Sequence, residues 1–168
     1  MPVVRYLIGL GANLGDRVAA LRRAASSIAT LGAIGGRSRI YSSAPIGGPP
    51  QPPYLNAALE LVSDLDPSEL LAATHEIERA LGRDRSAEVR WGPRPIDIDL
   101  LLAGARGEKI VSLADLTLPH PRLHERAFAL AGLVELDGDL MHPLLERPLS
   151  ALLREHARDL CAPTGEQL

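Results

Sequence analysis

The order of the apolar segments constrains the fold of this chain more than any other feature of its sequence. Short, apolar segments bounded by turn-forming residues predict four buried strands: residues 3–9, 37–41, 55–62 and 96–102. Two segments with apolar residues at helical spacing, 16–31 and 66–81, lie between them. This β-α-β-β-α-β order is that of the ferredoxin-like, split βαβ arrangement. We therefore expect an α+β sandwich in which both helices cover one face of an antiparallel sheet, while the other face is available for loops and a ligand.

Capping signals at the ends of both predicted helices support this order. Asp66 and Glu69 are spaced as an N-cap and its capping-box partner, and Gly82 follows the last apolar residue of the second helix. Asp16 is expected to begin the first helix and Gly32 to end it as a C-cap glycine. The pattern predicts two further helices: residues 126–136 and 148–158.

The remaining segments are expected to form loops and turns. Residues 42–53 include the run APIGGPPQPP, and proline cannot donate a hydrogen bond to a sheet. Residues 83–95 are polar, and the LPHP sequence at 118–121 cannot be a central strand; between them lies a short apolar stretch at 110–111. With neither a repeat nor a linker in its 168 residues, the chain is expected to form a single domain over residues 1–168.

Composition excludes several classes of protein. The formal net charge is −3, whereas a dedicated nucleic-acid-binding protein is expected to be basic. No apolar run approaches the roughly 20 residues that span a bilayer, and the N-terminal residues do not form a secretory signal. A single cysteine, Cys161, allows no internal disulfide and fits a reducing compartment. We therefore expect a cytoplasmic monomer that binds neither nucleic acid nor membrane.

The glycine-rich motif GLGANLG at residues 9–15 follows a predicted strand and precedes a helix. It resembles a dinucleotide-binding loop, but such a loop needs an acidic residue about 20 positions later, where Ser38 and Arg39 stand. A tight turn in which Asn13 and Asp16 cap the following helix is the better interpretation.

An acidic pair gives the chain its first candidate for chemistry. Side chains alternate along a strand, so Asp97 and Asp99 project to one face and Ile98 to the other. Two neighbouring carboxylates repel each other unless cations neutralise them. They could bind Mg²⁺ together with substrate phosphates, or they could be solvated or paired with arginines. The pair alone does not decide between these interpretations.

The loop that precedes this pair favours the metal site. Arg83, Arg85, Arg90 and Arg94 lie in it with Trp91, and arginine makes bidentate contacts with phosphate. Carboxylates that bind Mg²⁺, combined with clustered arginines, are typical of phosphoryl transfer. A solvated, charged loop is the plain alternative, but an aromatic residue on a polar loop usually covers a surface.

Two more segments supply groups suited to a flat heterocycle. Tyr54 and Asn56 lie on one side of a strand, where a ring can stack and an amide can donate and accept hydrogen bonds. His120, Arg126 and Phe128 follow later in the chain; a histidine such as His120, taken alone, is more often structural than catalytic.

These residues leave two other functions open. One is a different Mg²⁺-dependent nucleotidyl or phosphoryl transferase that uses the same acidic pair and arginine loop. The other is a ferredoxin-like binding module without enzymatic activity, for which Asp97 and Asp99 would be dispensable.

Taken together, the motifs resemble the 6-hydroxymethyl-7,8-dihydropterin pyrophosphokinase family of folate biosynthesis. The matching segments occur in order over most of the chain: LGANLGDR (10–17), IYSSAPIG (40–47), QPPYLNAALEL (51–61), IERALGRDR (77–85), RWGPRPIDIDLLL (90–102) and LPHPRLHERAF (118–128). The family fold is a ferredoxin-like α+β sandwich, in agreement with the segment order.

The resemblance implies transfer of pyrophosphate from ATP to the hydroxymethyl oxygen of the pterin, leaving AMP. It implies that Asp97 and Asp99 hold two Mg²⁺ ions and act in catalysis with Arg83 and Arg94. The residues implied to bind the pterin are Ser43, Ala44, Ile46, Tyr54, Asn56, Trp91 and Phe128. Those implied to bind ATP are His75, Glu78, Arg85, Trp91, Arg94, Leu100, Thr117, His120 and Arg126.

Overall fold

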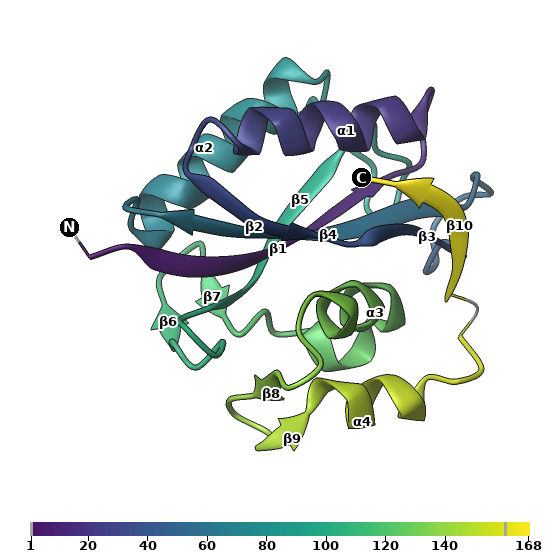
Figure 1. Cartoon of the computed structure of the whole chain (residues 1–168). Coiled ribbons are helices and arrows are strands. Elements are labelled where there is room, and N and C mark those ends of the chain that lie inside the picture. The colour runs from purple at the N-terminus through teal and green to yellow at the C-terminus, as the bar shows by residue number, and fades with distance from the viewer. Residues whose placement is uncertain (1, 160) are drawn as a thin grey trace.

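The protein is an α+β sandwich built on a six-stranded antiparallel sheet (Figure 1). The computed structural model describes residues 2–159 and 161–168, and only the main chain of Cys161. The central strands are β1 (Val4–Ala12), β4 (Tyr54–Ser63) and β5 (Asp97–Ala103), and β1 pairs antiparallel with both of the others. Helices α1 (Arg17–Ile28) and α2 (Pro67–Ala80) connect strands of this sheet. The predicted β-α-β-β-α-β order is confirmed.

The outer part of the sheet differs from the prediction. The single strand expected at residues 37–41 is two strands, β2 (Ala33–Arg37) and β3 (Arg39–Ser43), which both pair with β4. Ser38 separates them, although its main chain still bonds to Ala58. An unpredicted strand, β10 (Cys161–Gln167), extends the sheet by pairing with β3.

Helices α1 and α2 pack side by side on one face of the sheet (Figure 1). The predicted capping box of α2 is confirmed: the Asp66 carboxylate accepts from the main-chain N–H of Glu69, and the Glu69 side chain accepts from that of Asp66. Helix α1 begins after Asp16 as predicted, but Gly32 does not end it. The helix ends at Ile28, and Gly32 lies against β4, where a Cβ atom would come 2.3 Å from the carbonyl oxygen of Val62.

The opposite face of the sheet is only partly open, which corrects the expectation that it is free for loops. A second apolar core lies there, between the sheet and helices α3 (Ala127–Leu136) and α4 (Leu149–Glu155) (Figure 1). Helix α3 matches its prediction, whereas α4 ends three residues earlier than predicted. Short elements complete the fold: β6 (Val111–Ser112), β7 (Thr117–Leu118), the 3-10 helix η1 (Leu123–Glu125), β8 (Met141–His142) and β9 (Arg147–Pro148). Among the helices that the structure describes, none has the length and apolar character to cross a membrane.

The glycine-rich motif does not form the predicted turn in its first half. Strand β1 continues through Gly9 and Gly11 to Ala12 before the chain turns into α1. Asp16 caps the helix by accepting from the main-chain N–H of Ala19 at 3.0 Å, as predicted. Asn13 does not cap it; its side chain bonds to two loops of the site described below.

Candidate active site

A cavity lies over the C-terminal part of β1, on the face of the sheet that carries α3. The register places Gly9 opposite Asp99 and Gly11 opposite Asp97, while Gly11 also faces Asn56 on β4. Side chains at positions 9 and 11 would project toward this cavity; a Cβ atom on Gly11 would lie 3.3 Å from Asn56 Oδ1. Gly9 and Gly11 therefore form an open cavity floor between β5, which carries Asp97 and Asp99, and the Asn56 amide on β4.

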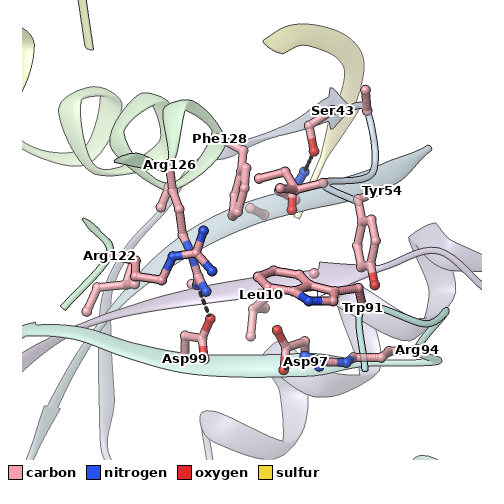
Figure 2. A pocket seen from close by; sticks show the side chains of 18 of the residues that line it. Leu10, Ser43, Tyr54, Trp91, Arg94, Asp97, Asp99, Arg122, Arg126 and Phe128 are labelled. Atoms are coloured by element: carbon pink, nitrogen blue, oxygen red, sulfur yellow. Dashed lines mark hydrogen bonds and ion pairs between the residues drawn. The ribbon is translucent and has the colours of Figure 1, made fainter. Parts of the chain in front are cut away.

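The predicted pterin-binding set comes together around this floor. All seven of its residues line the cavity: Ser43, Ala44, Ile46, Tyr54, Asn56, Trp91 and Phe128. Asn56 Nδ2 donates to Ser43 Oγ at 2.7 Å, which fixes the orientation of the buried amide. Figure 2 shows the Tyr54, Trp91 and Phe128 rings around the same space, with Asp97 and Asp99 along one side.

Asp97 and Asp99 project from β5 into the cavity, and Ile98 points into the main core between them. Each carboxylate is paired with arginine. Asp97 Oδ1 accepts from Arg83 Nη1 at 2.5 Å and lies 3.3 Å from Arg94 Nη1. Asp99 Oδ2 accepts from Arg126 Nη1 at 2.8 Å (Figure 2).

Asp97 lies close enough to Asp99 to affect its ionisation. Burial at the cavity floor and the charge of Asp97 raise the pKa of Asp99 to about 6, although the Arg126 guanidinium opposes the shift. A carboxylate whose pKa is raised in this way gains from any further cation that comes near it. The ligand-free cavity thus favours additional positive charge beside Asp99.

Arg83 lies at the centre of a buried ion network behind the cavity. Its side chain is 3% exposed and donates to Glu78, Glu88 and Asp97. Burial alone would lower the pKa of Arg83, but the hydrogen bond to Glu88 and the charges of Asp97 and Glu78 raise it above its ordinary value. The end of α2 places this residue, because Gly82 adopts a φ of 95° and the Arg83 N–H bonds to the carbonyl of Glu78.

Two loops, residues 44–53 and 83–95, meet over the cavity and are joined by Asn13. Its main chain donates to the carbonyl of Arg94 at 3.1 Å, and its Oδ1 accepts from the Arg94 N–H at 2.8 Å. Its Nδ2 donates to Gln51 Oε1 at 2.7 Å, and Gln51 in turn donates to the carbonyl of Trp91. This buried asparagine therefore connects the proline-rich loop to the arginine-rich loop.

Fewer of the residues predicted to bind ATP line the cavity. Trp91, Arg94 and Arg126 line the cavity, whereas Arg85 pairs with Glu78 behind it. The others do not line it: His75 on α2, Leu100 in the main core, exposed Thr117 on β7, and His120.

The His120 ring is held in its neutral form beside β5. Burial and the charge of Arg126 lower the pKa of His120 to about 4. Its Nδ1 accepts from the main-chain N–H of Arg122 at 3.1 Å, so the ring proton resides on Nε2.

Sequence reasoning missed several residues that line the cavity. Gly9 ends the predicted strand and Gly11 falls in the predicted turn, and neither is predicted to lie under a cavity, since no local pattern reveals that a strand is central. Gln51 and Arg122 stand within the motifs quoted above but received no role. The signal that could have found the glycines is their alternation, i and i+2, on the strand that precedes the helix.

The groups of the cavity fit a magnesium ion that also binds phosphate. Within residues 2–159 and 161–168, no cluster of three or more His, Cys, Asp or Glu could hold a metal. Asp97 and Asp99 alone would supply two carboxylate ligands. This number suits Mg²⁺, which commonly takes its other ligands from water and substrate phosphates. Arg94 Nε is buried and has no hydrogen-bond partner in the described part of the chain; the nearest carboxylate oxygen given for it, Glu88 Oε2, is 3.9 Å away.

The fold and the cavity together define a protein of the ferredoxin-like class whose cleft gathers carboxylates, arginines and aromatic rings. The model of the 7,8-dihydro-6-hydroxymethylpterin-pyrophosphokinase (HPPK) family matches residues 7–138. The chain belongs to this family. Its activity is therefore pyrophosphoryl transfer to hydroxymethyldihydropterin in folate biosynthesis, with ATP as co-substrate.

Three curated relatives are named 2-amino-4-hydroxy-6-hydroxymethyldihydropteridine pyrophosphokinase. The Bacillus subtilis protein is 43% identical over 77% of this chain and 75% of its own length. The Methylorubrum extorquens protein is 43% identical over 83% and 86%, and the Aquifex aeolicus protein 33% over 89% and 90%.

Solved structures support the fold. The wild-type HPPK-DHPS of Plasmodium falciparum superposes with a TM-score of 0.73 at 13% identity. The match covers 94% of this chain and 44% of that longer protein. At this identity the likeness shows a shared fold, which confirms the predicted ferredoxin-like α+β sandwich.

Proposed function

We propose that the cavity binds the pterin and that pyrophosphate passes from ATP to its hydroxymethyl oxygen beside Asp97 and Asp99. One observation carries the proposal: all seven predicted pterin contacts and both aspartates line a single cavity. Residues 1–168 would act as one domain and as a monomer. The single cysteine of the sequence supports the expectation of a reducing, cytoplasmic compartment.

The pterin ring would lie between Tyr54 and Phe128, with Trp91 covering it from the loop. Asn56 would read the edge of the heterocycle, and its bond to Ser43 supports this because the amide is buried and already oriented. The main chain around Ser43, Ala44 and Ile46 would supply further hydrogen bonds at the ring edge.

The reaction needs no covalent intermediate on the protein. The hydroxymethyl oxygen forms a bond with the β-phosphorus of ATP while the bond between that phosphorus and the α,β-bridging oxygen breaks. The hydroxyl proton is released, and AMP departs with the bridging oxygen. Arg94 and Arg126 would stabilise the negative charge that develops on the phosphates. Arg83 would act on the reaction from behind the cavity, through its bond to Asp97.

Binding of substrates would exchange the partners of the two aspartates. Asp97 and Asp99 would hold Mg²⁺, two ions in the proposed complex, which supply Lewis-acid activation and charge neutralisation when bound. Arg94 would turn from Asp97, and Arg126 from Asp99, toward phosphate oxygens. The buried Arg94 Nε has no hydrogen-bond partner among the described residues and lies 3.9 Å from Glu88 Oε2, too far for a hydrogen bond, which supports this change.

The nucleotide would extend from the cavity toward α2 and β7. His75, Glu78, Arg85, Leu100, Thr117 and His120 remain proposed ATP contacts on that side. Glu78 is buried and bonded to Arg83, Arg85 and the Ile98 N–H, so its contribution would be made through these partners.

The test measures pterin-dependent formation of AMP from ATP by Asp97→Asn and Asp99→Asn. We expect turnover to fall by orders of magnitude, while circular dichroism shows a folded chain. Asp64→Asn, at an exposed position after β4, is the matched control and should retain activity. Near-normal turnover in both site variants would refute the proposed metal site. ATP turnover that ignores the pterin would instead favour another nucleotidyl or phosphoryl transferase.

A further inference from the structure

Arg122 lines the cavity, but the proposed function gives it no role. The two other arginines of the cavity pair with its aspartates, whereas the ion pair of Arg122 is with Glu125, at 3.0 Å, outside the cavity. The Arg122 guanidinium carbon lies 5.1 Å from the centre of the Trp91 ring. We infer that Arg122 is a positioning residue that holds the Trp91 ring over the cavity through this cation–π contact (Figure 2).

The main chain of Trp91 is fixed by the neighbouring loop. Its φ is 61°, in the left-handed region that costs energy for a residue with a side chain. Gln51 Nε2 donates to its carbonyl oxygen at 2.7 Å, and a Cβ atom on Gly48 would come within 2.2 Å of that oxygen. These contacts hold the backbone of the loop, but they do not fix the ring.

The ring needs a separate anchor because Trp91 as a residue is 38% exposed. Arg90 also approaches it, at 5.6 Å, but Arg90 is the preceding residue of the same loop and moves with it. Arg122 belongs to a different segment, which is well anchored. Its N–H bonds to His120 Nδ1, and the next residue, Leu123, is completely buried in the second core.

A cation–π contact at such an exposed site is expected to shift the ratio of covering to open positions of the ring by about two- to fivefold. The contact itself does not depend on what the cavity binds. Its kinetic consequence rests on the proposed function, in which Trp91 covers the pterin. Loss of the contact should raise KM for the pterin more than it lowers kcat.

The experiment uses the intrinsic fluorescence of Trp91, the single tryptophan of the chain, with acrylamide as a quencher. Arg122→Met, which keeps the length of the apolar stem, should increase quenching in the absence of substrates, by no more than the roughly two- to fivefold shift in the ratio of covering to open positions. Arg122→Lys keeps a cation and should recover part of the protection. Arg106→Met, at an exposed turn outside the cavity, is the control and should match the wild type.

Thermal unfolding checks that each variant remains folded. Equal quenching in Arg122→Met and the wild type would overturn the inference, as would a lysine variant that is no better protected than the methionine variant. Failure of the proposed function would look different: the wild type itself would form no AMP in response to the pterin, while the difference in quenching would remain.

Discussion

Removal of the Glu78 side chain tests the ion network behind the cavity. Glu78 is 1% exposed and accepts three hydrogen bonds: from Arg83 Nη1 at 2.7 Å, from Arg85 Nη2 at 2.5 Å and from the Ile98 N–H at 2.7 Å. The last of these fixes β5 at the residue between the two aspartates. In Glu78→Ala, all three donors lose this acceptor at once.

The expected cost follows from burial. Breaking a buried ion pair by removing one partner costs about 3–5 kcal/mol, and an unsatisfied buried N–H costs about 1–3 kcal/mol. Arg83 keeps Glu88 and Asp97, which offsets part of the loss. We therefore expect Glu78→Ala to lower the free energy of unfolding by about 4 kcal/mol. Glu78→Gln keeps an acceptor for Ile98 and should cost about 1–2 kcal/mol.

Urea unfolding followed by circular dichroism measures both changes, provided that the dependence on denaturant is the same in each variant. Glu76→Ala is the control, because that side chain is 66% exposed and its pair with Arg79 should contribute no more than about 0.5 kcal/mol. An alanine variant within about 1 kcal/mol of the wild type would refute this account of the network. So would a glutamine variant as unstable as the alanine variant.

Two further predictions concern pH and the cavity floor. Because the pKa of Asp99 is raised to about 6, its stabilising contribution is complete below its unfolded pKa of about 3.9 and is lost as the pH rises through about 6. The lowered pKa of His120, about 4, acts with the opposite sign: its contribution is complete above about 6.5 and is lost as the pH falls toward 4. In Asp99→Asn, the free energy of unfolding should therefore rise more steeply between pH 4 and 6 than it does in the wild type. Urea unfolding at several pH values measures both profiles, and parallel profiles would contradict the prediction. Gly11→Val should fill the floor beside Asn56 and raise KM for the pterin about tenfold, with KM for ATP little changed; an unaltered KM for the pterin would place its ring elsewhere.

Features that depend on local chemistry could be predicted from the sequence. The capping box at Asp66 and Glu69 uses groups three residues apart, and the alternation of Asp97, Ile98 and Asp99 follows from the twofold period of a strand. In each case the determining contacts lie within a few residues.

Features that depend on distant partners could not be predicted. Strand β10 contains Pro163 and Gly165, which argue against a strand, and it exists because β3 offers an unpaired edge. Gly32 has the spacing of a helix cap, but its small size is needed for its approach to β4. Asn13 has the chemistry of a cap, yet its partners lie in loops that the sequence cannot bring together.

The surroundings of Asp97 and Asp99 in the structure explain why the sequence allows two interpretations of this acidic pair. Pairing of Asp97 and Asp99 with arginine and binding of a metal by the same carboxylates appeared to be alternatives. In the structure, Arg94 and Arg126 neutralise the two aspartates, and both arginines line the cavity where the proposed function places phosphates. The repulsion between two carboxylates has to be compensated before substrates arrive as well as afterwards. Under the proposed function, these arginines would turn to phosphate when a metal replaces them, and the two interpretations would describe successive states of one site.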